Sequence, residues 1–189
     1  MGNLGPEMDA RRFKVAARAA DGAAAVVVAG DIVNEWNNQE YIDLASDALA
    51  LFNAPHGVHL TNGVHLVPGN HDTDSHAATA QLFREQLAHF RDTFGVDYHS
   101  FTTEHATVVM INSESLIANE NHPDFGSASI HHALAVQDEA EGQWQWLEAT
   151  LADAAAGPRR HILPVMHHPP FLNVPTEDAQ YFNWPPIAR

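Results

Sequence analysis

The chain has 189 residues, 45% of them hydrophobic, which is enough to bury the core of a single domain over residues 1–189. Its net charge of −15 argues against a protein that binds nucleic acid, because such proteins concentrate cations against the phosphate backbone. The absence of cysteine excludes disulfides and thiolate chemistry, and without a signal peptide or a run of about 18 apolar residues we expect a soluble protein, cytoplasmic by default.

The first half of the chain alternates predicted helices with predicted strands. A helix over residues 7–20 is followed by an apolar strand over residues 24–29 and by a helix over residues 39–52. A short strand over residues 64–67 and a helix over residues 77–94 come next. The continuous apolar runs are typical of parallel strands that helices cover on both faces.

The second half adds antiparallel strands. Aromatic and β-branched residues predict a hairpin over residues 98–111, and a long acidic loop without regular structure is expected over residues 112–137. A helix over residues 139–155 and a strand over residues 162–166 follow, and residues 171–189 form a loop rich in proline and aromatic residues. We therefore expect an α/β fold with mixed sheets.

Three of the predicted strands end in polar side chains. Asp31 follows the first strand, Asn70, His71 and Asp72 follow the second, and His167 follows the last. Because the carboxyl ends of strands in a layered α/β domain meet at one edge, we expect these side chains to converge. A carboxylate, an amide and an imidazole suit a divalent ion such as Mn, Fe, Zn or Mg, whereas the alternative is that these residues only terminate their strands.

The same residues resemble the motifs of a known family, the calcineurin-like metallophosphoesterases. The matching segments are Gly30-Asp31-Ile32-Val33-Asn34, Gly69-Asn70-His71-Asp72 and His167-His168-Pro169. Further similarity at residues 94–101, 143–147 and 181–183 favours the calcineurin-like phosphoesterase domain-containing branch of the complete S-transactivated type. The resemblance runs nearly the whole length of the chain, and Gly-Asn-His-Asp directly after a strand is a fairly specific signal.

The resemblance implies a layered αββα sandwich with mixed sheets and a site for two divalent metal ions. Asp31 would bridge the two ions, and Asn70 and His167 would complete one of them. Asn34 and His168 would support these ligands without binding an ion themselves. The identity of the metals is left open by the sequence.

The resemblance also implies a reaction, the hydrolysis of a phosphomonoester or phosphoprotein by a water activated by two metal ions. His71 would protonate the leaving alkoxide or stabilise the phosphoryl oxygens, and Asp72 would orient His71. The alternatives are a metal-binding or scaffold domain that keeps this fold without catalysis, and an acidic α/β domain whose polar strand ends bind nothing. Neither nucleic acid nor a membrane is an expected partner, and the natural substrate and oligomeric state are left open.

Two motifs of the family are not found in the sequence, namely the opening Asp-x-His or Asp-x-Gln and the closing Gly-His-x-His. The resemblance therefore implies an incomplete domain that lacks the first strand and the C-terminal part of the fold. From this we expect weak binding of one divalent ion, impaired hydrolysis, and an unpaired sheet edge that promotes association.

Overall fold

A computed structural model of the chain describes residues 14–52, 63–73, 79–118, 137–158 and 161–170. After a helical turn at residues 14–19, its elements in chain order are β1 (Val26–Ala29), α2 (Gln39–Ala50), β2 (Val64–Val67), α3 (Ala80–Phe94), β3 (His99–Thr102), β4 (Ala106–Met110), α4 (Ser113–Ala118), α6 (Gln137–Ala156) and β5 (His161–Val165). No helix within these ranges is long and apolar enough to cross a membrane.

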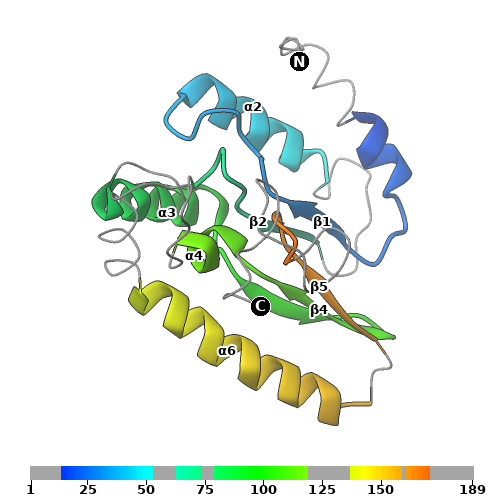
Figure 1. The fold of residues 1–189 in the computed structure, drawn as a ribbon. Helices are drawn as coiled ribbons and strands as arrows, with labels where there is room; N and C mark the ends of the chain where they lie inside the picture. Colours follow the sequence, from blue (N-terminus) through cyan, green and yellow to red (C-terminus); the bar gives the residue numbers. More distant parts are fainter. Residues whose placement is uncertain (1–13, 53–62, 74–78, 119–136, 159–160, 171–189) are drawn as a thin grey trace.

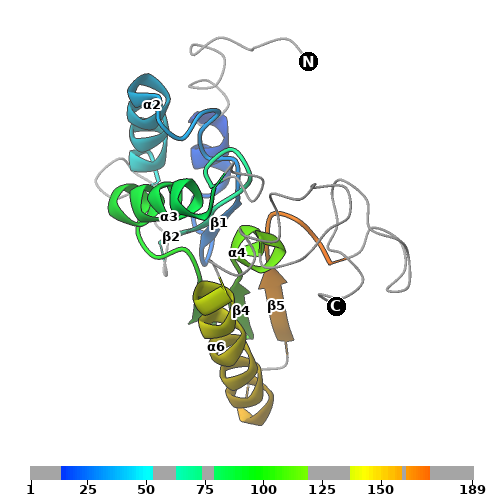
Figure 2. The ribbon, with the colours of Figure 1, turned by 60° about the vertical axis from the view of Figure 1, so that its left-hand side comes forward.

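The strands form two sheets that are packed between helices. β1 and β2 pair in parallel, while β4 lies between β3, which is antiparallel to it, and β5, which is parallel. Figure 1 shows α2 and α3 beyond the first sheet and α6 beyond the second, and the turned view in Figure 2 shows the same order of layers. The predicted αββα sandwich with mixed sheets is therefore confirmed.

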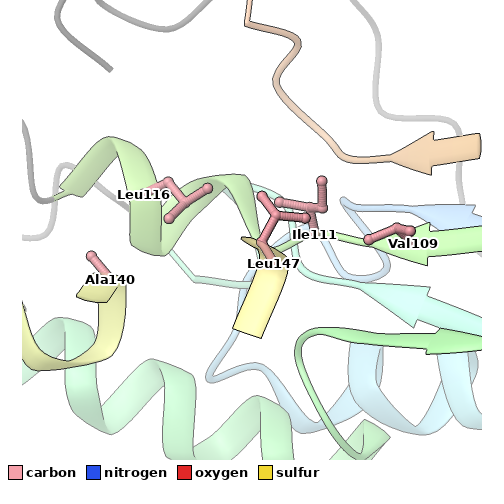
Figure 3. Packing of buried hydrophobic residues seen from close by; sticks show 5 residues of the cluster. All are labelled: Val109, Ile111, Leu116, Ala140 and Leu147. Atoms are coloured by element: carbon pink, nitrogen blue, oxygen red, sulfur yellow. The ribbon is translucent and has the colours of Figure 1, made fainter. Parts of the chain in front are cut away.

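Separate apolar clusters hold these layers together. Between the sheets, Val67 of β2 packs with Val108 and Met110 of β4. On the outer face of the second sheet, the cluster in Figure 3 joins β4 and the two helices that follow it; its members are Val109, Ile111, Leu116, Ala140 and Leu147. Burying a large apolar side chain contributes about 1.5–3 kcal/mol, so these contacts hold β2 against β4 and β4 against the helices α4 and α6.

The loop predicted for residues 171–189 lies outside the described residues, as do residues 7–13 of the first predicted helix and residues 119–136 of the predicted acidic loop. Elsewhere the predicted elements agree with the structure in type and order, with one exception. Residues 112–137 were expected to form a loop throughout, but they include the helix α4. The Asn112 side chain accepts a hydrogen bond from the Ser115 amide at 3.2 Å, and the Gln143 side chain of α6 brackets the Asn112 backbone at 2.8 and 3.0 Å. A helix of six residues is too short to form by itself, so contacts with α6 decide its formation.

A buried polar network fixes the start of α4 in the fold. The Arg91 side chain of α3 forms ion pairs with Asp97 at 2.7 Å and with Glu139 of α6 at 2.9 Å. Asp97 in turn accepts a hydrogen bond from the Asn112 side chain at 2.9 Å. Because Asp97 is only 3% exposed, its carboxylate would be buried without compensation if these partners were lost. The network therefore ties α3, α4 and α6 into one unit.

The strand β1 has one edge that no described strand covers. The Val26 amide donates to the Gly63 carbonyl next to β2, so the backbone groups of Val27, one residue further on, face the opposite side. The Val27 side chain is 44% exposed. Among the described residues no strand pairs with this edge, so a further strand could add to it.

Candidate metal centre

The ends of β1, β2 and β5 bring three side chains together. The His167 imidazole lies with Nε2 3.0 Å from Asn70 Oδ1 and 3.4 Å from Asp31 Oδ1. These residues are separated by 39 or more positions in the sequence, and only the packing of the two sheets places them side by side. The convergence that the strand ends predicted is present in the structure.

Two glycines make this close approach possible. A Cβ atom on Gly69 would lie 2.5 Å from the Asp31 amide nitrogen and 2.9 Å from His167 Nδ1. A Cβ atom on Gly30 would lie 2.6 Å from His167 Cγ, and Gly30 also has a φ of +84° that favours glycine. Asp31 itself has a φ of 52°, a left-handed conformation that residues other than glycine adopt rarely, aspartate more readily than most, and that clusters at functional sites.

The hydrogen bonds of His167 decide which of its nitrogens faces the other two side chains. Nδ1 donates to the Ala29 carbonyl at 2.9 Å, so in the neutral ring Nε2 carries a lone pair. That lone pair meets the oxygens of Asn70 and Asp31, and no proton lies between these atoms while His167 is neutral. A cation placed between them would remove this repulsion. Histidine ligands of metal ions commonly donate their other N–H to a backbone carbonyl in this way.

The distances from His167 Nε2 to the other two donor atoms also fit one divalent ion. Two atoms that bind an ion at about 2.1 Å and at a right angle lie about 3.0 Å apart. The Nε2–Oδ1 distances of 3.0 and 3.4 Å are close to this value. Among the described residues, no cluster of three or more histidine, aspartate and glutamate side chains could hold a metal ion, so the amide of Asn70 is needed to complete this set.

The predicted catalytic histidine, His71, lies beside this site, and the backbone orients its ring. Its Nδ1 donates to the Asn34 carbonyl at 2.9 Å, and its own amide donates to Asp31 Oδ1 at 3.2 Å. The ring is therefore held with Nε2 as the nitrogen that can exchange a proton with a bound molecule. Asn34 contributes through its carbonyl oxygen, a group that every residue has, which is why the side-chain pattern could not indicate this contact.

Asp72 has different partners from those that the resemblance implied. Its carboxylate accepts hydrogen bonds from the backbone amides of Gly69 at 2.8 Å, Ile32 at 3.1 Å and Val33 at 2.9 Å. None of its described contacts is with His71. The predicted orientation of His71 by Asp72 is therefore replaced by the contact with Asn34. Asp72 instead joins the loop after β1 to the turn after β2.

Asp72 is also the most strongly perturbed carboxyl group near the site. It is 2% exposed, and burial raises its pKa to about 6, although its three backbone hydrogen bonds lower it. The nearby negative charge of Asp31 raises it further. Burial of a carboxylate is costly unless it is hydrogen-bonded, so the three backbone amides hold Asp72 at the junction between the two loops.

His168, predicted to support the ligands, is held by residues that the sequence reasoning missed. Its amide donates to Ser113 Oγ at 3.0 Å, and its Nδ1 lies 2.7 Å from Glu114 Oε1. Burial lowers the pKa of His168, but the contact with Glu114 and the charge of Asp31 raise it above its usual value overall. Asn112, Ser113 and Glu114 follow the end of β4, so the rule that singled out the other polar strand ends could have found them.

Comparison with known sequences gives a consistent set of relatives. The sequence model of a family described as calcineurin-like phosphoesterase matches residues 9–189. The serine/threonine-protein phosphatase CPPED1 of Danio rerio is 32% identical over 117 residues, which are 62% of this chain and 32% of that protein. CPPED1 of Rattus norvegicus is 32% identical over 124 residues, which are 66% of this chain and 34% of that protein. The match thus spans about a third of the length of these relatives. No solved structure matches the chain.

Proposed function

Because the chain belongs to the calcineurin-like phosphoesterase family, we propose that it hydrolyses phosphoric esters with the help of divalent metal ions. The observation that carries this proposal is the meeting of Asp31, Asn70 and His167, whose unshared electron pairs face one another beside His71. Since the curated relatives are named serine/threonine-protein phosphatases, we propose a phosphoprotein or a small phosphomonoester as the substrate. We also propose that residues 1–189 belong to one domain, because the polar network crosses from α3 to α6.

Each side chain of the site has a separate task in this proposal. Asp31, Asn70 and His167 would hold one divalent ion, and Asp31 would bridge to a second ion in a complete site. When bound, the ions supply an activated water and neutralise the charge of the phosphoryl group. His71, with Nδ1 fixed on the Asn34 carbonyl, gives the proton on Nε2 to the leaving oxygen, which departs as an alcohol.

The charge of the chain explains why a metal is needed. A net charge of −15 repels a phosphate ester, and a divalent cation in the site is what would allow an anionic substrate to approach. Removal of divalent ions with EDTA is therefore expected to abolish turnover.

A specific observation favours a second candidate, a metal-binding or scaffold domain without catalysis. The described residues supply three donors to one ion, whereas a pair of ions needs more ligands than this. In this alternative the chain binds a divalent ion but turns over no ester.

The two candidates are separated by an assay with p-nitrophenyl phosphate and a phosphoserine peptide in the presence of Mn²⁺. We expect slow turnover by the wild-type chain, because the resemblance implies an incomplete site and impaired hydrolysis, and we expect its loss in Asn70→Ala and in His71→Ala. Matched controls are Gln145→Ala and His105→Ala, which remove an amide and an imidazole at exposed positions on α6 and between β3 and β4. These control variants are expected to retain the wild-type rate.

Each result selects one interpretation. Metal-dependent turnover that requires Asn70 and His71 supports the phosphoesterase. Binding of Mn²⁺ in calorimetry without any turnover selects the scaffold. A chain that neither binds Mn²⁺ nor hydrolyses either substrate contradicts both candidates.

A further inference from the structure

One side of the candidate metal centre is supported from α4, an element that carries none of the three motifs. Ser113 and Glu114 are the first two residues of α4, and both are 0% exposed. Their side chains contact His168, which directly follows the ligand His167 and is 6% exposed. Within the family resemblance His168 is a neighbour of a ligand, but nothing in that resemblance involves α4.

We propose that Glu114, assisted by Ser113, is a positioning residue that sets the orientation of His167 by clamping His168. The inference rests on the proposed function, because it takes His167 to be a metal ligand. It concerns a residue that does not touch substrate or metal and that acts through the backbone and ring of its partner.

Two contacts hold His168, one to its backbone amide and one to its ring. The Ser113 hydroxyl accepts the His168 amide at 3.0 Å, which fixes the peptide unit between the two histidines. Glu114 Oε1 lies 2.7 Å from His168 Nδ1, which fixes the ring. With residue 168 held at both points, the planar peptide bond also fixes the carbonyl group and Cα of His167, from which its side chain extends.

The orientation of His167 matters because its two ring nitrogens make different contacts at the same time. Its Nδ1 reaches the Ala29 carbonyl at 2.9 Å, while its Nε2 points at Asn70 Oδ1 at 3.0 Å. The rings of His167 and His168 are 4.6 Å apart with their planes inclined at 58°, so a rotation of one ring would displace the other. A displacement of the ligand ring would break one of its two contacts.

The anchor itself is rigid, which a positioning residue requires. The Asn112 side chain, directly before Ser113, is held by Asp97 at 2.9 Å and by Ser115 at 2.8 Å. Glu114 Oε2 is buried and has no hydrogen-bond partner among the described residues, so Oε1 makes the described contacts of this carboxylate, with His168 Nδ1 at 2.7 Å and with the Ser113 hydroxyl at 3.5 Å. Removing one partner of a buried ion pair is strongly destabilising, because it leaves the other partner uncompensated.

The test compares Glu114→Gln with Glu148→Gln in the full chain. Glu148 lies exposed on α6, so its substitution makes the same chemical change without touching the site. Calorimetry with Mn²⁺ measures the metal affinity of each variant. Because loss of a group that supports a metal ligand costs about 10- to 100-fold in affinity, we expect weakening within this range for Glu114→Gln and none for Glu148→Gln.

A second readout separates positioning from stability and needs no metal. Long-range ¹H–¹⁵N spectra of the metal-free protein report which nitrogen of His167 carries the proton. We expect a single Nδ1–H form in the wild-type chain and a mixture of forms in Glu114→Gln. An unchanged His167 spectrum and an unchanged Mn²⁺ affinity, with only a lower melting temperature, would show that Glu114 is merely structural and would overturn the inference.

The remaining outcomes are also decisive. If Glu114→Gln does not fold, as judged by near-ultraviolet circular dichroism, Ser113→Ala replaces it. We then expect a smaller loss of Mn²⁺ affinity and a smaller change in the His167 spectrum. The absence of both changes overturns the inference. If the wild-type chain binds no Mn²⁺, the proposed function fails, while a changed His167 spectrum in Glu114→Gln still supports the clamp. If that spectrum is also unchanged, both fail.

Discussion

Substitution of Gly69 by alanine tests whether the close approach of the strand ends creates the site. The added Cβ would lie 2.5 Å from the Asp31 amide nitrogen and 2.9 Å from His167 Nδ1, whereas ordinary contact begins at 3.4 Å. The neighbouring backbone would therefore have to move by about 0.9 Å, and it cannot do so by rotating a flexible side chain. A displacement of about 1 Å in a catalytic arrangement can reduce the rate about 100-fold, and overpacking costs about 1–3 kcal/mol of stability.

The expected result is a fall of about 100-fold in metal-dependent turnover of p-nitrophenyl phosphate, with weaker binding of Mn²⁺. Gly142→Ala is the matched control, because Gly142 lies inside α6 with no atom within 4 Å of the added methyl group. Alanine there should raise the stability by about 0.5–1 kcal/mol in chemical denaturation and leave turnover unchanged. A Gly69→Ala variant with the turnover and metal affinity of the wild-type chain would refute the reasoning.

Two further predictions concern pH and association. Burial lowers the pKa of His99 below its ordinary 6.5, and so does the charge of His65, whose Nδ1 lies 2.8 Å from His99 Nε2. The unfolded chain therefore protonates His99 more readily than the folded chain, and the free energy of unfolding decreases as the pH falls below 6.5. The melting temperature should therefore fall more in the wild-type chain than in His99→Gln between about pH 7.5 and about pH 5.5, and equal falls would contradict this assignment. The open edge of β1 should cause association that rises with concentration in sedimentation velocity and is reduced by Val27→Lys but not by Val96→Lys, a change at a position that is 64% exposed. A wild-type chain that stays monomeric at all concentrations would count against a free edge.

The type and order of the main elements could be predicted because their signals are local. The apolar run before Asp31 and the helical spacing before Phe94 each depend on residues within one element, and both elements are present in the structure. The short helix α4 was missed because its formation depends on Gln143, which lies 31 positions beyond Asn112. Residues 113–118 contain helix formers and follow a favoured N-cap residue, Asn112, but a run of six residues is too short for helical periodicity to be recognised.

The sequence by itself therefore determined which chemical groups stand at the strand ends, since a polar residue after an apolar run and a glycine is visible without coordinates. Only the tertiary structure decided how these groups act on one another. The tautomer of His167 depends on a carbonyl 138 positions away, His71 is oriented by the backbone of Asn34, and Asp72 holds a loop that precedes it by about 40 positions. Contacts with main-chain atoms leave no trace in residue identity, because every residue carries the same carbonyl and amide groups.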